Sequence, residues 1–118
     1  MISLIYLASP YTDSNEAIMA RRYKQVALAT AYWLRKDQYI ISPILNFHPV
    51  AELTDLPRDH AFWRRLDERL LASCDELWVL MLPGWEDSVG VREEIIFAEM
   101  NNIPISYKEY PGDLPQVV

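Results

Sequence analysis

The sequence has little cysteine and no long apolar run, and each shortage excludes a class of protein. Cys74 is the single cysteine, so an internal disulfide is impossible, and together with two histidines it gives no zinc-ligand spacing. No apolar stretch approaches the ~18 residues needed to cross a bilayer, and the N-terminal stretch lacks a basic leader. We therefore expect no metal, no other cofactor and no membrane association, with a cytoplasmic location.

Basic residues and glycines are also scarce. Lys and Arg number 11 against 17 Asp and Glu, which gives a net charge of −6 and argues against binding to polymeric DNA or RNA. A few local donors can still hold one small anion. The chain has 3 glycines and shows neither a glycine-rich phosphate loop nor a nucleophile elbow.

What is present is an alternation of apolar runs and helical patterns in 118 residues, enough for a single domain over residues 1–118. Strands are expected at 2–8, 38–44, 76–82 and 103–109, and helices at about 13–36, 60–74 and 90–101. The intervening stretch at 45–59 is predicted to be long and irregular, with room for one helical turn. This order predicts an α/β fold: a three-layer α/β/α sandwich with a parallel, flavodoxin-like (Rossmann-like) sheet of four to five strands.

The long first helix has an expected start and an expected buried side. Asp13 with Glu16 three residues on resembles a capping box. The apolar stripe expected to face the sheet has helical spacing and consists of Met19, Tyr23, Val26, Ala27, Thr30 and Leu34.

A ligand crevice is expected where the strand order reverses. In doubly wound sheets, ligands bind outside the carboxyl ends of the strands at such a point. If the first strand lies beside the 76–82 strand, the loops that begin at Ser9 and Pro83 meet there. The start of the last helix would then lie over the crevice.

Two adjacent glutamates in that last helix differ in how well a structural role explains them. If Gly90 is the N-cap, Glu93 falls at the third helical position, where a carboxylate complements the free N–H groups and the helix dipole. Glu94 lines up with Val91 and Ala98 on a mainly apolar side. Glu94 is therefore either a solvated helix-end acid or a group placed for chemistry.

Asp67 is a second acid within an apolar helical stripe, at helical spacing from Trp63, Leu70 and Leu71. It could pair with a neighbouring arginine or lie at the edge of the stripe. The alternative is chemical, since two carboxylates in one apolar crevice are a known arrangement for glycosidic bond cleavage. In that case Asp67 and Glu94 should lie near each other, roughly 5 to 5.5 Å apart as in retaining glycosidases, and repulsion should raise the pKa of one of them.

Five further residues are candidates for ligand contact, each with a plain alternative. Ser9 and Ser88 could hold an anion beside helix N-terminal N–H groups, but a lone serine is usually a turn or cap residue. Tyr11 and Trp85 could stack on a planar base, or could simply pack. His48, which precedes a proline in the 45–59 stretch, could contact a ligand.

Four segments together resemble the nucleoside 2-deoxyribosyltransferase-like superfamily, in particular a branch of small bacterial and phage proteins. They are "IYLASPY", "SPILNFHPVAEL", "FWRRLDERLLASCDELWVL" and "GWEDSVGVREEIIFAE", which span nearly the whole chain. The resemblance implies a single nucleoside 2-deoxyribosyltransferase-like domain acting on nucleosides or nucleotides.

The resemblance also implies roles for particular residues. Tyr6 matches the family's first-strand tyrosine, Asp67 matches its active-site aspartate, and Ser88, Gly90 and Glu94 match an S-x-G-x-x-x-E segment whose glutamate is the nucleophile. Ser88 corresponds to a phosphate-binding serine of nucleotide-hydrolysing members. The predicted catalytic set is thus Glu94, Asp67 and Tyr6.

These observations predict N-glycosidic bond cleavage of a nucleoside or nucleoside 5'-monophosphate through a glutamate nucleophile, by hydrolysis or by base exchange. The alternative is a non-catalytic nucleotide-binding or sensing module. Partners are expected to be a small nucleoside or nucleotide and further copies of the chain. Exposed-looking aromatics, including Trp33, Phe47, Trp63 and Trp85, favour a homodimer or larger homo-oligomer.

Overall fold

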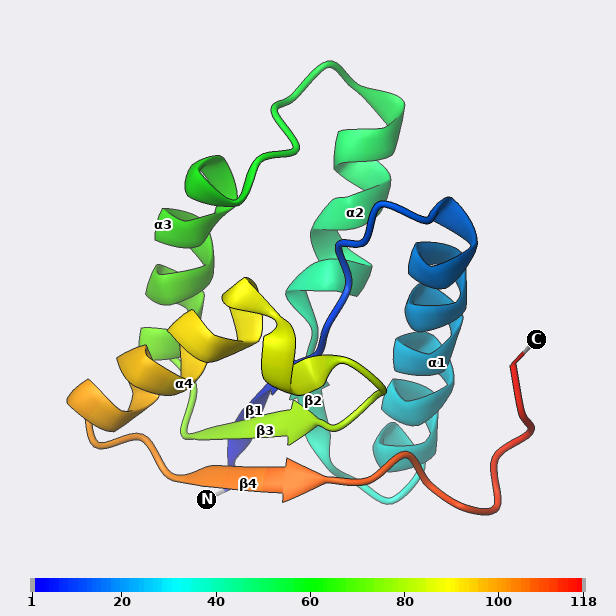
Figure 1. The fold of residues 1–118 in the computed structure, drawn as a ribbon. Helices are drawn as coiled ribbons and strands as arrows, with labels where there is room; N and C mark the ends of the chain where they lie inside the picture. Colours follow the sequence, from blue (N-terminus) through cyan, green and yellow to red (C-terminus); the bar gives the residue numbers. More distant parts are fainter. Residues whose placement is uncertain (1, 118) are drawn as a thin grey trace.

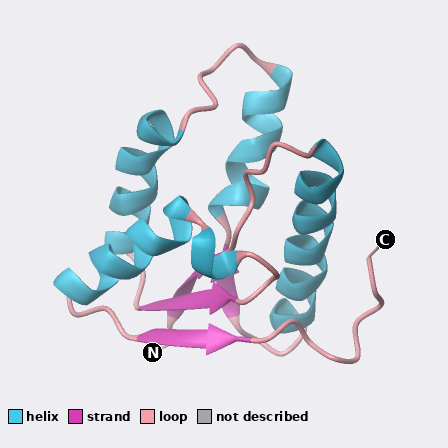
Figure 2. Ribbon diagram, in the orientation of Figure 1, coloured by secondary structure: helices cyan, strands magenta, loops and turns pink. Residues whose placement is uncertain are grey.

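A computed structural model describes residues 2–117 and shows a parallel four-stranded sheet between two layers of helices (Figures 1 and 2). The strands lie in the order β2-β1-β3-β4. They are β1 (Leu4–Ala8), β2 (Tyr39–Ile41), β3 (Glu76–Leu80) and β4 (Ile105–Lys108). The predicted α/β sandwich is confirmed.

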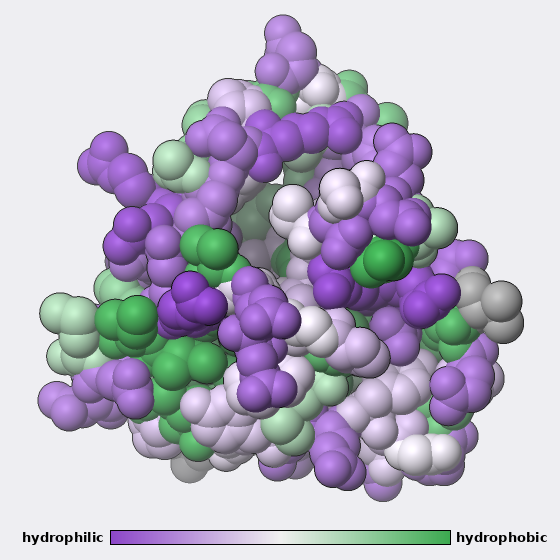
Figure 3. Space-filling model, viewed as in Figure 1, coloured by the Kyte–Doolittle hydropathy of each residue, from purple (hydrophilic) through white to green (hydrophobic). Residues whose placement is uncertain are grey.

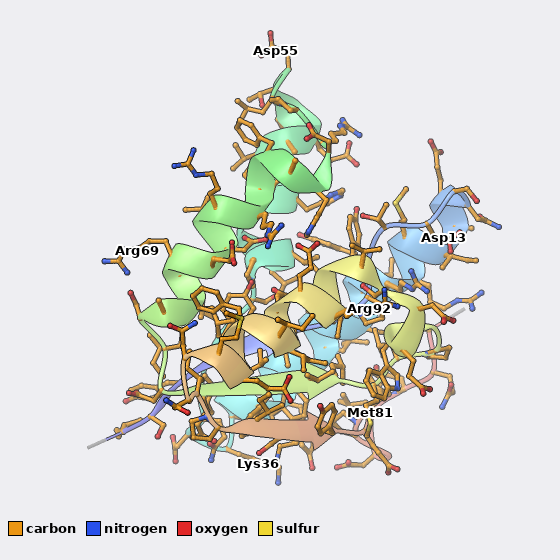
Figure 4. All side chains as sticks on the ribbon, turned by 60° about the vertical axis from the view of Figure 1, so that its left-hand side comes forward. Asp13, Lys36, Asp55, Arg69, Met81 and Arg92 are labelled. Carbon is orange, nitrogen blue, oxygen red and sulfur yellow. The ribbon has the colours of Figure 1, made fainter. Side chains whose placement is uncertain are left out.

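The helices are α1 (Glu16–Leu34), α2 (Pro43–Leu53), α3 (His60–Ala72) and α4 (Val89–Met100), with a short 3₁₀ turn η1 (Trp85–Asp87) before α4. Within residues 2–117, no helix is long and apolar enough to span a membrane. The α2–α3 connection lies farthest from the sheet, and Asp55 projects from its tip (Figure 4).

The two central strands are buried because their runs are apolar on both faces, as in parallel sheets covered by helices. Side chains alternate along β1. Ile5 and Leu7 join a cluster with α1, whereas Tyr6 and Ala8 join a cluster with α3 and α4. The sheet therefore has one face under α1 and the other under α3 and α4.

The strand order reverses between β1 and β3, which pair with Tyr6 beside Leu77 and Ala8 beside Val79. The chain leaves β1 toward β2 on one side, and β3 continues to β4 on the other. The loops after Ala8 and Leu80 consequently meet at the same edge, as the sequence predicts.

Arg22 joins these two loops. Its guanidinium donates hydrogen bonds to the carbonyl of Pro83 at 3.1 Å and to those of Tyr11 and Thr12 at 3.3 Å each. Gly84 allows this approach, because its φ is +92° and a Cβ there would lie 2.6 Å from an Arg22 nitrogen.

The 45–59 stretch was wrongly predicted to be irregular. Ser42 caps α2 by accepting a hydrogen bond from the Leu45 N–H, and Pro43 fits the first helical position, where no N–H is needed. Pro49 lies inside the helix. Prolines normally mark helix ends, which is why the pattern misled.

The start and the buried side of α1 also differ from expectation. Asn15 is the N-cap and accepts from the Ala17 N–H, so Asp13 lies outside the helix and instead accepts from the Asn15 N–H. The buried stripe is rotated by about one residue: Trp33, expected to be exposed, is 8% exposed, whereas Leu34 is 50% exposed.

Candidate active site

Tyr6 and Glu94 meet beneath α3 and α4, although 88 positions separate them in the chain. Tyr6 is fully buried on β1, and its hydroxyl donates a hydrogen bond to Glu94 Oε2. Glu94 points inward from α4 because it follows Val91 by one turn, and Val91 is buried against the sheet. The predicted inward orientation of Glu94 is therefore observed.

Burial dominates the electrostatics of this pair. It raises the pKa of Glu94 to about 8, which the Tyr6 hydrogen bond partly opposes and the charges of Asp67 and Glu93 reinforce. The pKa of Tyr6 is raised well above its usual value, again mainly by burial and then by Glu94. Burial thus favours the protonated form of the Glu94 carboxyl.

Asp67 belongs to the same electrostatic cluster and comes from α3. Its Oδ1 is buried and has no hydrogen-bond partner among the described residues. Burial raises the pKa of Asp67 to about 6, and the nearby His60 opposes that rise. The alternative interpretation, a salt bridge from Asp67 to a neighbouring arginine, has no counterpart among the ion pairs of residues 2–117. The predicted carboxyl spacing of roughly 5 Å stays a prediction.

Glu93 has a structural role, but a different one from that predicted. Ser88, rather than Gly90, is the N-cap of α4, so Glu93 lies beyond the first turn and cannot act in capping. It instead accepts from His60 Nε2 at 2.5 Å and pairs with Arg64 Nε at 3.1 Å. These partners lower the pKa of Glu93, with the His60 hydrogen bond as the main cause.

The two predicted residues at the start of α4 lie together. Ser88 Oγ accepts from the Val91 N–H at 3.2 Å, which is an ordinary capping role. A Cβ on Gly90 would lie 3.9 Å from both Ser88 Oγ and His60 Cε1, an ordinary contact. Neither crowding nor backbone conformation therefore requires glycine at this position.

Tyr11 and His48 also come together, from the loop after β1 and from α2. The Tyr11 hydroxyl lies 2.7 and 2.8 Å from the two ring nitrogens of His48, and the rings meet edge to face at 4.7 Å. Glu52 lies 3.2 Å from His48 Nε2, one helical turn on. Burial raises the pKa of Tyr11 to about 12, so its hydroxyl is a proton donor at neutral pH.

The remaining two candidates are placed differently. Ser9 is 6% exposed at the end of β1, and its Oγ is buried without a partner among the described residues. A buried hydroxyl without a partner is costly and fits a position that a ligand satisfies. Trp85, by contrast, packs on Tyr107 of β4 with ring centroids 5.6 Å apart, which supports its packing interpretation.

The face over the carboxyl ends of the strands is hollowed, between α3, the α2–α3 connection and the segment after β1 (Figure 3). A cavity of about 210 Å³ lies between the loops after β1 and β3, and its lining includes Ser88, Arg22 and Thr12 but neither Glu94 nor Asp67. A cavity of about 250 Å³ between α1, β2 and α2 contains none of the predicted site residues. Among residues 2–117, no group of three or more His, Cys, Asp or Glu side chains is arranged to hold a metal ion.

His60, Arg64 and Arg22 were missed by the sequence analysis. His60 precedes Asp67 by seven residues, which is about two helical turns and therefore the same side of α3. That spacing could have drawn attention to His60. Nothing local to the sequence could have shown that Glu93 lies opposite His60 and Arg64, or that the Pro83 carbonyl lies opposite Arg22.

The fold is a doubly wound α/β domain. Two partly buried acids, Asp67 and Glu94, lie on the side of the sheet that α3 and α4 cover. Comparison with solved structures agrees on the fold: the chain is similar to a 2-deoxyribosyltransferase from the psychrotolerant bacterium Bacillus psychrosaccharolyticus, with a TM-score of 0.63 and 19% identity, over 96% of this chain and 77% of that one. The chain belongs to the family described as Domain of unknown function (DUF1937), whose model matches residues 3–109. No curated protein sequence matches it.

Proposed function

We propose that the protein cleaves the N-glycosidic bond of a nucleoside or nucleoside 5'-monophosphate, with Glu94 as nucleophile. The observation that carries the proposal is the buried Glu94 carboxyl, hydrogen-bonded to Tyr6 and accompanied by an Asp67 oxygen that has no partner. Removing two carboxyl groups from water lowers the stability of the folded protein, and such pairs are characteristic of catalytic sites. The likeness of the fold to a 2-deoxyribosyltransferase supports the same class of substrate.

In the proposed mechanism, a Glu94 oxygen attacks the anomeric carbon as the bond from that carbon to the base breaks and its electron pair leaves with the base. Asp67 donates a proton to the departing base. Water, or a second base, then attacks the anomeric carbon and releases Glu94, with Asp67 accepting the proton of the incoming group. Tyr6 orients the nucleophile, because its hydroxyl occupies Oε2 and leaves Oε1 to attack.

The two pKa values place constraints on this mechanism. The reaction needs Glu94 ionised and Asp67 protonated, whereas the free protein favours the proton on Glu94. The pair carries one proton between its two pKa values, and the active arrangement is one of the two forms of that state. The pH profile of kcat/KM should therefore be bell-shaped, with its two limbs near the pKa of Asp67, about 6, and the pKa of Glu94, about 8.

The test is incubation of the purified protein with a panel of nucleosides and nucleoside 5'-monophosphates, followed by chromatography for released base. Parallel reactions with an added acceptor base separate hydrolysis from exchange. Peptide mass mapping of a trapped glycosyl-enzyme then identifies the nucleophile. An adduct on Glu94 is expected, and an adduct on Asp67 would reverse the proposed roles.

A second candidate function is that of a nucleotide-binding or sensing module without turnover. The observation that favours it is the cavity between the loops after β1 and β3, whose lining includes Ser88 and Arg22 but neither Glu94 nor Asp67. Calorimetry against the same panel, paired with the chromatographic assay, separates the two candidates. Tight binding without base release over hours would support the binding module.

We propose further that the protein assembles into a homodimer or larger closed oligomer. Phe62 and Leu66 on α3 are 44% and 42% exposed, and Ile96 on α4 is 47% exposed, so these two helices present apolar side chains to their surroundings. Light scattering at micromolar concentration should give a mass of at least twice the 13.8 kDa of one chain. A monomer mass would contradict this proposal.

A further inference from the structure

The two helices that carry the acids are joined to each other by side chains. His60, the first residue of α3, holds Glu93 of α4 at 2.5 Å, and Arg64, one turn on, holds the same carboxylate oxygen at 3.1 Å. Glu93 immediately precedes Glu94. The bridge formed by His60, Arg64 and Glu93 therefore lies one residue from the proposed nucleophile. On α3, His60 lies about two turns before Asp67 and Arg64 about one turn before it.

The first half of α3 has few other attachments. Among its residues, Leu71 is the one that is buried, and it lies near the helix C-terminus. At the other end, α3 follows the exposed α2–α3 connection. Trp63 stacks there on Phe47 of α2 with ring centroids 5.7 Å apart and donates a hydrogen bond to the Pro57 carbonyl at 2.8 Å, but neither contact reaches α4. The first half of α3 is consequently held to α4 by the polar contacts of His60 and Arg64 with Glu93. Figure 4 shows the side chains that fill the space between the two helices.

The imidazole of His60 also lies close over the start of α4, since its Cε1 would be 3.9 Å from a Cβ on Gly90. Its effect reaches both helices: it opposes the rise in the pKa of Asp67 and is the main cause of the lowered pKa of Glu93. His60 therefore interacts with the acid of its own helix as well as with its partner across the interface.

We infer that His60 is a positioning residue of the proposed site: through its bond to Glu93 it holds α3 against α4 and sets the distance and orientation between the Asp67 and Glu94 carboxyl groups. This inference rests on the proposed function. Reacting groups must be held within fractions of an ångström of their productive geometry. An interaction that fixes the two helices next to the site therefore affects the rate of the chemical step. Replacing His60 should change substrate binding less than turnover, because His60 does not contact the substrate in the proposed mechanism.

The test compares His60→Ala with His60→Gln and with a matched control, Glu68→Gln. Glu68 pairs with the same Arg64, at 3.4 Å, but lies on α3 and joins no second helix. His60→Ala should lower kcat by about 10- to 100-fold with KM changed by less than about threefold, while Glu68→Gln stays within about twofold of wild type. His60→Gln keeps a donor for Glu93 and should recover part of kcat.

Equal kcat in His60→Ala and Glu68→Gln, or a loss confined to KM, would overturn the inference. Thermal unfolding of each variant shows that the assays are made on folded protein.

A second measurement does not depend on turnover. The pKa of the Glu94 carboxyl, followed by NMR with ¹³C-labelled glutamate, should fall in His60→Ala, because a loosened α3 admits water to a carboxyl whose pKa burial has raised. Glu68→Gln should leave it unchanged. A wild-type protein that releases no base refutes the proposed function, whereas an unchanged Glu94 pKa in His60→Ala refutes the positioning role, so the two failures are distinct.

Discussion

The two faces of the sheet are built from the same strands but differ in chemistry. Under α1, Ile5 and Leu7 pack with Trp33 and Trp78, whose rings meet edge to face at 5.3 Å, and the cluster is apolar. Under α3 and α4, the same strand contributes Tyr6 instead, which bonds to Glu94. Because side chains alternate along a strand, adjacent residues serve different layers. One layer contributes packing and the other carries ionisable groups at an energetic cost.

The same contrast occurs within one turn of α4. Glu93 faces His60 and Arg64 and has a lowered pKa, whereas its neighbour Glu94 faces the buried side and has a pKa raised to about 8. Helical geometry turns successive side chains by about 100° around the axis, which is sufficient to separate them. Partly exposed, paired acids are ordinary, but a desolvated acid needs a function to explain it.

The largest effect on turnover is expected from replacing Glu94, and the same change at Glu93 should have a much smaller one. Glu94→Gln should lower turnover by at least about 10³-fold, because it removes the proposed covalent nucleophile while keeping an acceptor for Tyr6. Glu93→Gln is the matched control and should lose far less. The measurement is base release by chromatography, and equal activity of Glu94→Gln and wild type would eliminate the mechanism.

A substitution on the other face should affect stability and leave the chemistry intact. Trp33→Ala removes a side chain that is 8% exposed and should lower the free energy of unfolding by about 3–5 kcal/mol. Activity per folded molecule at low temperature should stay near wild type, because α1 lies across the sheet from Glu94. Urea unfolding and the base-release assay measure the two quantities, and a loss of activity in fully folded protein would show that the faces are coupled.

The third prediction concerns how stability depends on pH. The folded protein raises the pKa of Glu94 from 4.5 to about 8, so it binds this proton more tightly than the unfolded chain does. Wild type should therefore lose stability as the pH rises from about 4.5 to about 8. Glu94→Gln removes this loss and should be more stable than wild type at pH 9 by up to about 5 kcal/mol, the equivalent of that pKa shift, with little difference at pH 4.

Denaturant unfolding across this pH range is the measurement. Glu93→Gln should show the opposite sign, because the pKa of Glu93 is lowered and its pairing stabilises the folded protein once the carboxylate is ionised. Parallel pH profiles for wild type and Glu94→Gln would mean that Glu94 is not desolvated in the folded protein.

The smallest expected effect is at Gly90. Because a Cβ there would meet nothing closer than 3.9 Å, Gly90→Ala should stabilise the protein by about 0.5 kcal/mol through helix propensity. If the start of α4 contacts the substrate, the same change should raise KM. Improved stability with an unchanged KM would leave Gly90 without a role in binding.

Local patterns predicted most of the elements, and their failures have local causes. The strands were recognised because buried parallel strands are continuous apolar runs. Helix α2 was missed because proline usually marks the end of an element, although Pro43 fits the first helical position and Pro49 lies inside the helix. The buried side of α1 was misplaced by about one residue, since the choice between Trp33 and Leu34 depends on Trp78 of β3, which packs on Trp33 on the same face of the sheet.

The sequence by itself determined the alternation of strands and helices and the parallel sheet, because these follow from residue periodicities of 2 and 3.6 along the chain. For Glu94 it indicated the apolar side of the last helix but left open whether the carboxylate is solvated or placed for chemistry. Only the tertiary structure decided that the Tyr6 hydroxyl reaches Glu94, that Glu93 is paired with His60 rather than used in capping, and that Arg22 joins the two loops. Those contacts link residues 88, 33 and 61 positions apart. They depend on strand order and helix packing, which no local pattern specifies.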